Sequence, residues 1–183
     1  NIEYFLFVLN DSTLNYSYYN TSGYLTGCSR VMQANSIFTI QNNIITSTSC
    51  FNISDENITI DGKGYTLTFG DASGTDQLDG IYSTKKNTTI KNLKILKGSA
   101  AGSSASRPGI FFNGPTSGTI ENMTINSTYY GIYLLNGGNI STENVTIVNS
   151  SSYGIFLNAS VNSSFTNVVV DGAMGDAIFL AGS

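Results

Sequence analysis

The chain has 183 residues, the size of one domain, with a net charge of −4 and a charged content of only 11%. Nucleic-acid binding needs concentrated Lys and Arg, so a chain of this charge without a basic cluster is not expected to bind nucleic acid. No apolar run approaches the roughly 20 residues that a membrane-spanning helix requires, so no transmembrane segment is predicted.

Residues 1–27 share no pattern with the rest of the chain. Residues 2–9 form one apolar, strand-like run, and residues 10–26 are rich in Tyr, Ser, Asn and Thr. Because an open stack of strands exposes apolar side chains and unpaired backbone groups, we expect residues 1–27 to cap the N-terminal end of a domain formed by residues 28–183. The alternative is that residues 2–9 add as a strand to a neighbouring molecule.

Two cysteines, Cys28 and Cys50, flank strand-like runs at residues 37–40 and 44–45. In an oxidising compartment they are expected to form a disulfide, and the alternative is a pair of buried free thiols. A bridge that closes a loop of about 20 residues stabilises by about 3 kcal/mol in the chain-entropy model.

Two segments without a strand pattern interrupt the chain at residues 69–79 and 97–108. The first contains Asp71, Asp76 and Asp79, and clustered carboxylate oxygens are the ligands that Ca²⁺ prefers. These three residues are the candidate metal site, with a solvated polar loop as the alternative. No cofactor is expected.

A short phrase recurs along the second half of the chain. It reads Gly-Ile-Phe-Phe, Gly-Ile-Tyr-Leu, Gly-Ile-Phe-Leu and Ala-Ile-Phe-Leu, with starts at Gly109, Gly131, Gly154 and Ala177 that lie 22, 23 and 23 positions apart. Gly80-Ile81-Tyr82 is an earlier copy. A second phrase, such as Thr119–Ile125, recurs between the copies with the same step. A fixed period of this size indicates a solenoid.

Each repeat contains two or three runs of alternating apolar and polar residues, rich in Ile, Val and Thr and separated by Gly, Asn and Ser. This pattern is typical of strands joined by turns, and a repeat is too short for a strand and a full helix. The sequence therefore predicts an all-β solenoid of about five to six coils. Each coil has about three short strands, and successive coils stack in parallel roughly 4.8 Å apart.

Equivalent positions of successive coils fall into columns. Three apolar columns are predicted to point inward: Ile81, Ile110, Ile132, Ile155 and Ile178; Ile95, Ile125, Ile147 and Val170; and Leu93, Met123, Val145 and Val168. A column of asparagines at a turn, also predicted to lie inward, consists of Asn92, Asn122, Asn144 and Asn167. Stacked Asn side chains are expected to hydrogen-bond from coil to coil.

An aromatic column follows the first apolar column by one position. Its members are Tyr82, Phe111, Tyr133, Phe156 and Phe179. Since side chains alternate along a strand, these rings are expected on the outer face. They form either a stacked ladder that stiffens the sheet or an apolar stripe buried against a neighbouring subunit or the N-terminal segment.

The last coil starts at Ala177, and the sequence stops at Ser183 without a capping element. We expect either a fragment of a longer solenoid or a last coil whose Ile178 and Leu180 are covered by another subunit. Stacking of identical ends is heterologous and builds rings or open filaments, so a homo-oligomer or polymer is the expected state.

The segment Cys50-Phe51-Asn52-Ile53-Ser54, followed by the run from Asn57 to Leu67, resembles the opening coil of archaeal cell-surface proteins. The resemblance covers residues 28–183 and implies the right-handed parallel β-helix fold that these proteins share with pectate lyases. It is specific for the fold and not for the function, because this fold hosts lyases, hydrolases, adhesins and wall components.

Thirteen Asn-x-Ser/Thr sequons predict a secreted or cell-surface protein with covalent N-glycans, although an Asn-, Ser- and Thr-rich chain also makes sequons by chance. Asn122 and Asn144 are expected to be unmodified because they belong to the inward column. The better candidates are Asn15, Asn20, Asn126, Asn149 and Asn162.

The function predicted from these features is that of a non-enzymatic structural component of an extracellular assembly, such as an S-layer, a sheath or a filament, which self-associates through the ends and edges of its solenoid. A carbohydrate-binding adhesin and a polysaccharide lyase or hydrolase are the alternatives. Glu121 and Glu143 lie about one coil apart, near the separation of a retaining glycosidase pair. They occupy an outward position without Trp platforms, so no catalytic residue is assigned.

Overall fold

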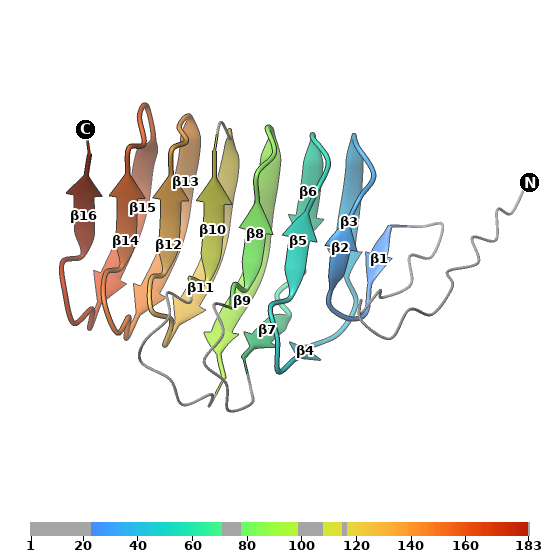
Figure 1. Ribbon diagram of the computed structural model, residues 1–183. Helices are drawn as coiled ribbons and strands as arrows, with labels where there is room; N and C mark the ends of the chain where they lie inside the picture. The colour runs from blue at the N-terminus through green and yellow to red at the C-terminus, as the bar shows by residue number, and fades with distance from the viewer. Residues whose placement is uncertain (1–22, 71–77, 99–107, 115–116, 183) are drawn as a thin grey trace, which may run out of the picture.

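The computed structural model describes residues 23–70, 78–98, 108–114 and 117–182. These residues form sixteen strands and no helix, so no described element is a helix able to cross a membrane. Every strand pair is parallel, and successive coils stack along one axis as two facing sheets (Figure 1). The fold is the all-β parallel β-helix that the sequence predicts.

The first sheet has nine strands and the second has seven. The first contains β1 (Tyr24–Leu25), β3 (Ser36–Ile40), β4 (Ile44–Ile45), β6 (Ile58–Asp61), β7 (Thr66–Phe69), β9 (Thr88–Lys97), β11 (Gly118–Asn126), β13 (Ile140–Val148) and β15 (Ser164–Asp171). The second contains β2 (Ser29–Val31), β5 (Phe51–Ile53), β8 (Ile81–Ser83), β10 (Ile110–Asn113), β12 (Ile132–Leu135), β14 (Ile155–Asn158) and β16 (Ile178–Ala181). From β8 onward the chain alternates between the sheets, with one strand in each per coil.

The strand register reproduces the predicted columns. Ile110 lies opposite Ile81 on one side and Ile132 on the other, and Ile132 lies opposite Ile155. All four side chains are completely buried, because alternate residues of a strand face the same side of the sheet. Ile178 pairs with Ile155 in the same column but is 44% exposed, since β16 is an edge strand of its sheet.

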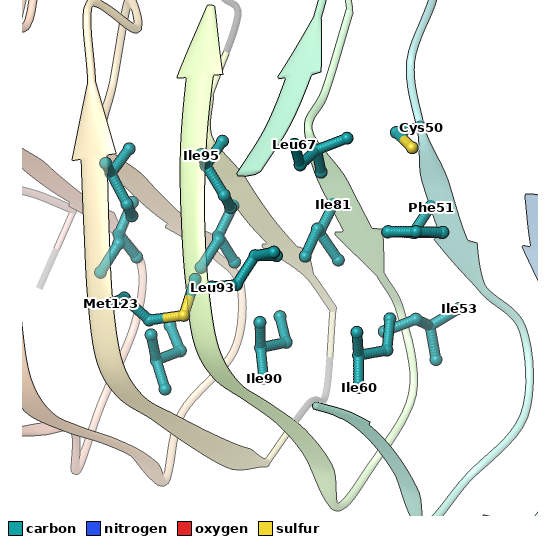
Figure 2. Close-up of a cluster of buried hydrophobic side chains, with 14 of the residues drawn as sticks. Cys50, Phe51, Ile53, Ile60, Leu67, Ile81, Ile90, Leu93, Ile95 and Met123 are labelled. Atoms are coloured by element: carbon teal, nitrogen blue, oxygen red, sulfur yellow. The ribbon is translucent and has the colours of Figure 1, made fainter. Parts of the chain in front are cut away.

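The core lies between the two sheets. It contains mainly aliphatic side chains, together with four phenylalanines that are at most 1% exposed: Phe38, Phe51, Phe69 and Phe112. Figure 2 shows Ile81 from the second sheet and Ile90, Leu93 and Ile95 from β9 directed into one shared interior. Each of the four is at most 1% exposed. Burial of one such side chain stabilises by roughly 1.5–3 kcal/mol, so the repeated columns supply the main driving force for stacking.

From β8 onward each coil contains two strands rather than the predicted three. β9, β11, β13 and β15 each run through the predicted turn, and the Asn at that position has a φ of 51–54°. On either side of Asn122, Glu121 still pairs with Glu143, and Met123 with Val145. A single left-handed residue therefore bends the strand at a corner, and pairing is interrupted only there.

The disulfide between Cys28 and Cys50 is present, with 4.5 Å between the two Cα atoms. The cysteines immediately precede β2 and β5, so the bridge joins two neighbouring coils at the start of the second sheet. It closes a loop of the predicted length, and we assign it about 3 kcal/mol of stabilisation.

Several sequence predictions fall on residues outside the described ranges. They concern residues 1–22 of the predicted cap and most of the two interrupting segments. Within the predicted cap, β1 is described and pairs with β3, so residues 24–25 belong to the first sheet. The capping role of residues 1–27 stays a prediction.

Replacement of Thr142 by Val is expected to stabilise the protein by about 1 kcal/mol. Thr142 lies in a core column between Ile120 and Phe165, is 1% exposed, and has no hydrogen-bond partner for its Oγ1 among the described residues. Valine has the same shape and removes the unsatisfied hydroxyl. Urea unfolding measures the difference, and a Thr142→Val protein less stable than the parent would show that the hydroxyl is bonded.

Candidate functional site

The predicted asparagine ladder is confirmed. Nδ2 of Asn122 donates to Oδ1 of Asn92 over 3.3 Å, Nδ2 of Asn144 donates to Asn122 over 3.3 Å, and Nδ2 of Asn167 donates to Asn144 over 3.1 Å. The expectation that these side chains point inward is wrong, because Asn122, Asn144 and Asn167 are exposed. The left-handed residue stands at the outer corner of each coil, so its side chain projects to the surface.

A carboxylate that sequence reasoning did not single out lies at the base of the ladder. Oδ1 of Asp61 accepts hydrogen bonds from Nδ2 of Asn92 at 3.0 Å and from the backbone N–H of Lys63 at 3.1 Å. The Lys63 ammonium lies 2.9 Å from Oδ2. Burial raises the pKa of Asp61, but these hydrogen bonds and the ammonium outweigh burial and hold the pKa below its usual value. The ladder therefore ends on an anion.

A second asparagine column lies at the corner where the chain enters the first sheet, and sequence reasoning missed it. Nδ2 of Asn57 donates to Asn35 over 2.8 Å, Nδ2 of Asn87 donates to Asn57 over 2.7 Å, and Oγ of Ser117 donates to Asn87 over 3.0 Å. The strand register continues this column through Asn139 to Asn162. We call these six residues the first corner column. From Ser117 to Asn35 each side chain donates to the preceding coil, and the backbone N–H of Asn87 donates in return to Oγ of Ser117 at 3.1 Å.

Corner geometry explains much of the asparagine content. Eleven of the fourteen non-glycine residues with positive φ are Asn, which tolerates the left-handed conformation better than most residues. Seven of the sequons begin at such corners: Asn57, Asn87, Asn122, Asn139, Asn144, Asn149 and Asn162. A strand that contains Ser or Thr continues from or follows six of these corners, and a Ser-rich turn follows Asn149, so the fold itself generates these sequons.

The glycosylation candidates differ in what their amides contact. Nδ2 of Asn149 donates to Oδ1 of Asn126 at 3.3 Å, whereas Asn162 is exposed and makes no side-chain hydrogen bond to another described residue. Asn15 and Asn20 lie outside the described residues. Glycosylation at all five positions stays a prediction.

Replacement of Asn122 by Ala is expected to destabilise the protein by about 2 kcal/mol. The change removes two ladder hydrogen bonds and places alanine at a φ of 54°. Asn122→Gly removes the same hydrogen bonds but accepts the positive φ. Chemical denaturation should place the Gly variant between the parent and the Ala variant, and equal stability of the Ala variant and the parent would contradict a structural role for the ladder.

The outer aromatic column is a stacked ladder, which is one of the two arrangements predicted for it. The rings of Phe111 and Tyr133 lie 4.6 Å apart with 2° between their planes, and those of Tyr133 and Phe156 lie 4.9 Å apart with 11°. Tyr82 and Phe179 continue the column at both ends at 5.3 Å and 5.5 Å with tilted rings.

Two further aromatic side chains, Tyr130 and Tyr153, form a second row beside this column. Neither was predicted from the sequence. Tyr130 stacks on Tyr153 at 5.9 Å, and Tyr153 stacks on Phe179 at 4.5 Å. Burial raises the pKa of Tyr130 to about 12. Because stacked rings cover one another's faces, the array presents ring edges to solvent. A sugar that stacks on an aromatic side chain needs a free ring face, so this array is poorly suited to bind one.

The carboxylates do not gather into a site within the described ranges. Glu121 lies opposite Glu143 as predicted, but Oε1 of Glu121 is 3.9 Å from the Lys91 ammonium, and Glu143 is exposed. No group of three His, Cys, Asp or Glu side chains among the described residues is placed to hold a metal. Of the three predicted calcium ligands, Asp71 and Asp76 lie outside the described residues. Asp79 is described, and burial raises its pKa to about 7. The calcium site stays a prediction.

The hollows on the described surface include two beside features discussed above. One, of about 560 Å³, lies beside the disulfide and is lined by Cys28, Cys50 and Arg30, whose Nε donates to Oγ of Ser54 at 2.7 Å. The other, of about 420 Å³, lies on the corner of the asparagine ladder and is lined by Lys63 and Lys94 among others. Neither was predicted, because both depend on which corners stack on one another.

Comparison with known proteins identifies the repeat region. The family model described as "Right handed beta helix region" matches residues 29–183. No curated protein and no solved structure matches the chain.

Proposed function

The chain belongs to the right handed beta helix family, and we propose that it is a non-enzymatic structural component of an extracellular surface assembly, such as an S-layer, a sheath or a filament. The regular columns on its surface support this role. Asparagine amides and aromatic rings at equivalent positions bind neighbouring coils to each other, so the repeated positions serve cohesion.

The observation that carries the proposal is the edge formed by β15 and β16. Each is the terminal strand of its sheet, so one row of backbone N–H and C=O groups in each has no described strand beside it. The core-facing side chains of β16 are open as well, with Ile178 44% and Leu180 70% exposed. A long apolar strand edge is a template for pairing with another chain. A further coil of a longer solenoid and a second copy of this chain both fit this edge, and the second copy is the occupant that we propose.

The first corner column supports end-to-end stacking of copies. Nδ2 of Asn57 and of Asn87 donate to the preceding coil, so the amide of Asn35 at one end of the column retains its N–H groups, and the amide of Asn162 at the other end makes no hydrogen bond among the described contacts. Two unpaired amides at opposite ends of the same column can hydrogen-bond to each other in a head-to-tail contact between copies. Such heterologous contacts build open filaments or rings.

An extracellular location is part of the proposal. The Cys28–Cys50 disulfide fits an oxidising compartment, and the sequons fit a glycosylated surface. A carbohydrate-binding adhesin, or a polysaccharide lyase or hydrolase, is the alternative. Either would act as a monomer or small oligomer, so the state of association separates these functions from the structural one.

Light scattering of the purified chain over a range of concentrations tests the proposal. The expected result is a mass that grows with concentration, and a return to monomer in Leu180→Lys, which places a charge on the open edge. Ile37→Lys is the matched control, because Ile37 is similarly exposed at 66% but lies on β3, inside the sheet order. A parent chain that stays monomeric throughout, or a Leu180→Lys variant that associates like the parent, would refute the proposal.

A further inference from the structure

Basic residues are concentrated at one level of the solenoid. Residues 80–107 contain six of the eight Lys and Arg residues and no Asp or Glu, whereas residues 108–183 contain four acidic residues and no basic one. Residues 1–79 contain two basic and eight acidic residues. The lysines of β9 stand three positions apart, at Lys91, Lys94 and Lys97, so they form no contiguous basic run in the sequence. In the fold they form a basic band between acidic coils.

The corner groove opens on this band. It has a volume of about 420 Å³ and is lined by Lys63, Lys94, Asn92, Asn122 and Thr124 together with Gly64 and Leu93. No carboxylate lines it. Lys94 is exposed, and its ammonium forms no hydrogen bond or ion pair with another described residue. A side chain added at Gly64 would meet no atom within 4 Å, so the entrance beside Lys63 is open.

The charges around the groove leave one positive charge unbalanced. The Lys63 ammonium is paired with Asp61, whose side chain is only 8% exposed. Lys91, one corner away, lies 3.9 Å from Glu121. The charge of Lys94 remains uncompensated. A group with a single negative charge, such as a carboxylate or a sulfate ester, complements it.

The groove also offers hydrogen-bond donors in fixed positions. Each ladder amide uses one N–H for the preceding coil, and an amide has two, so Asn92 and Asn122 each retain one donor. Lys63 is held in place by Asp61 at a φ of 50°, in a conformation that elsewhere in the described corners belongs mostly to Asn and Gly.

We propose that this groove binds an acidic saccharide of the extracellular surface through its carboxylate or sulfate group, with Lys94 as the charged anchor and the ladder amides as donors. A sugar of this class carries one anionic group and several hydroxyls, which suits one free ammonium surrounded by amides. Nucleic acid is a poorer fit, because it needs a row of cationic contacts to successive phosphates. This site goes beyond the proposed structural function, since it gives the assembly a ligand.

Titration of the isotopically labelled chain with a glucuronate oligosaccharide, followed by backbone amide shifts, tests this site. Shifts are expected at Gly64, Lys94 and Asn122, with an affinity that falls as salt rises. Lys94→Gln is expected to weaken binding about five-fold or more. Lys86→Gln is the matched control, because it removes the same charge from an exposed position on the entry corner of the same coil and should leave the affinity unchanged.

Four outcomes would overturn the proposal: a Lys94→Gln variant that binds like the parent, equal binding of the oligosaccharide with esterified carboxylates, equal binding of inorganic sulfate, or tighter binding of an oligothymidylate. Inorganic sulfate at equal affinity would assign a site for simple anions, and the oligothymidylate a site for nucleic acid. These titrations monitor the corner groove, which is distant from Leu180. A negative binding result therefore leaves the test of self-association unaffected.

Discussion

Replacement of Gly118 by Ala is expected to destabilise the protein by about 3 kcal/mol or more. Gly118 opens β11, and a Cβ at this position would overlap the carbonyl oxygen of Thr88 in the neighbouring strand β9. The overlapping atom is backbone, and β11 is paired on both sides, so neither strand can move away without breaking its ladder. Urea unfolding followed by circular dichroism measures the loss.

Gly114→Ala is the control for this prediction. Gly114 has a φ of +93°, and a Cβ there would meet nothing within 4 Å, so only the backbone preference is lost, about 1–2 kcal/mol. Gly118 is expected to be the more sensitive glycine although its φ is ordinary. A larger loss at Gly114 than at Gly118 would show that close strand approach is not what selects glycine at the start of β11.

Replacement of Ile132 by Ala is expected to cost 2–5 kcal/mol, with about 3.5 kcal/mol as the central value. Ile132 is completely buried in the middle of its column, between Ile110 and Ile155. Truncation leaves a cavity that two stacked coils border, and neither can close it without shifting its own strand. The free energy of unfolding from chemical denaturation gives the value.

Ile37→Ala makes the same chemical change on the outside of β3, where the side chain is 66% exposed. It should alter stability by no more than about 0.5 kcal/mol. A similar loss of stability at Ile37 and Ile132 would contradict the assignment of inward and outward faces on which the predicted columns depend.

The inward columns were predictable because two periods act together. Alternation within a strand decides which residues face the core, and the repeat of 22 or 23 residues decides which of them stack. Ile110, Ile132 and Ile155 follow from these two facts alone, whereas Ile81, 29 positions before Ile110, was placed by its copy of the Gly-Ile phrase. The strand register agrees for all four. The Cys28–Cys50 bridge was predictable for a different reason, because the chain has only two cysteines.

The corners were not predictable in the same way. The identity of a residue does not determine its φ. The sequence therefore did not indicate that Asn122 is left-handed, that its side chain points outward, or that β11 continues through the bend. The first corner column was not predicted because Ser117 stands where the other five members are Asn, so the asparagines alone do not show the regular spacing.

The groove was missed because it depends on the stacking of two unlike coils. Lys63 belongs to a turn between β6 and β7, whereas Lys94 lies within β9, and 31 positions separate them in the sequence. The pairing of both β6 and β7 with β9 brings the turn beside the strand. Sites of this kind arise between coils, so a column analysis of equivalent positions cannot find them.

Electron microscopy of the purified chain tests the central claim most directly. The structural function predicts regular rings, tubes or fibres with a repeat along the solenoid axis, and their loss in Leu180→Lys but not in Ile37→Lys. Isolated particles of monomer size for the parent chain at high concentration would contradict self-association through the β15–β16 edge, and with it the structural function.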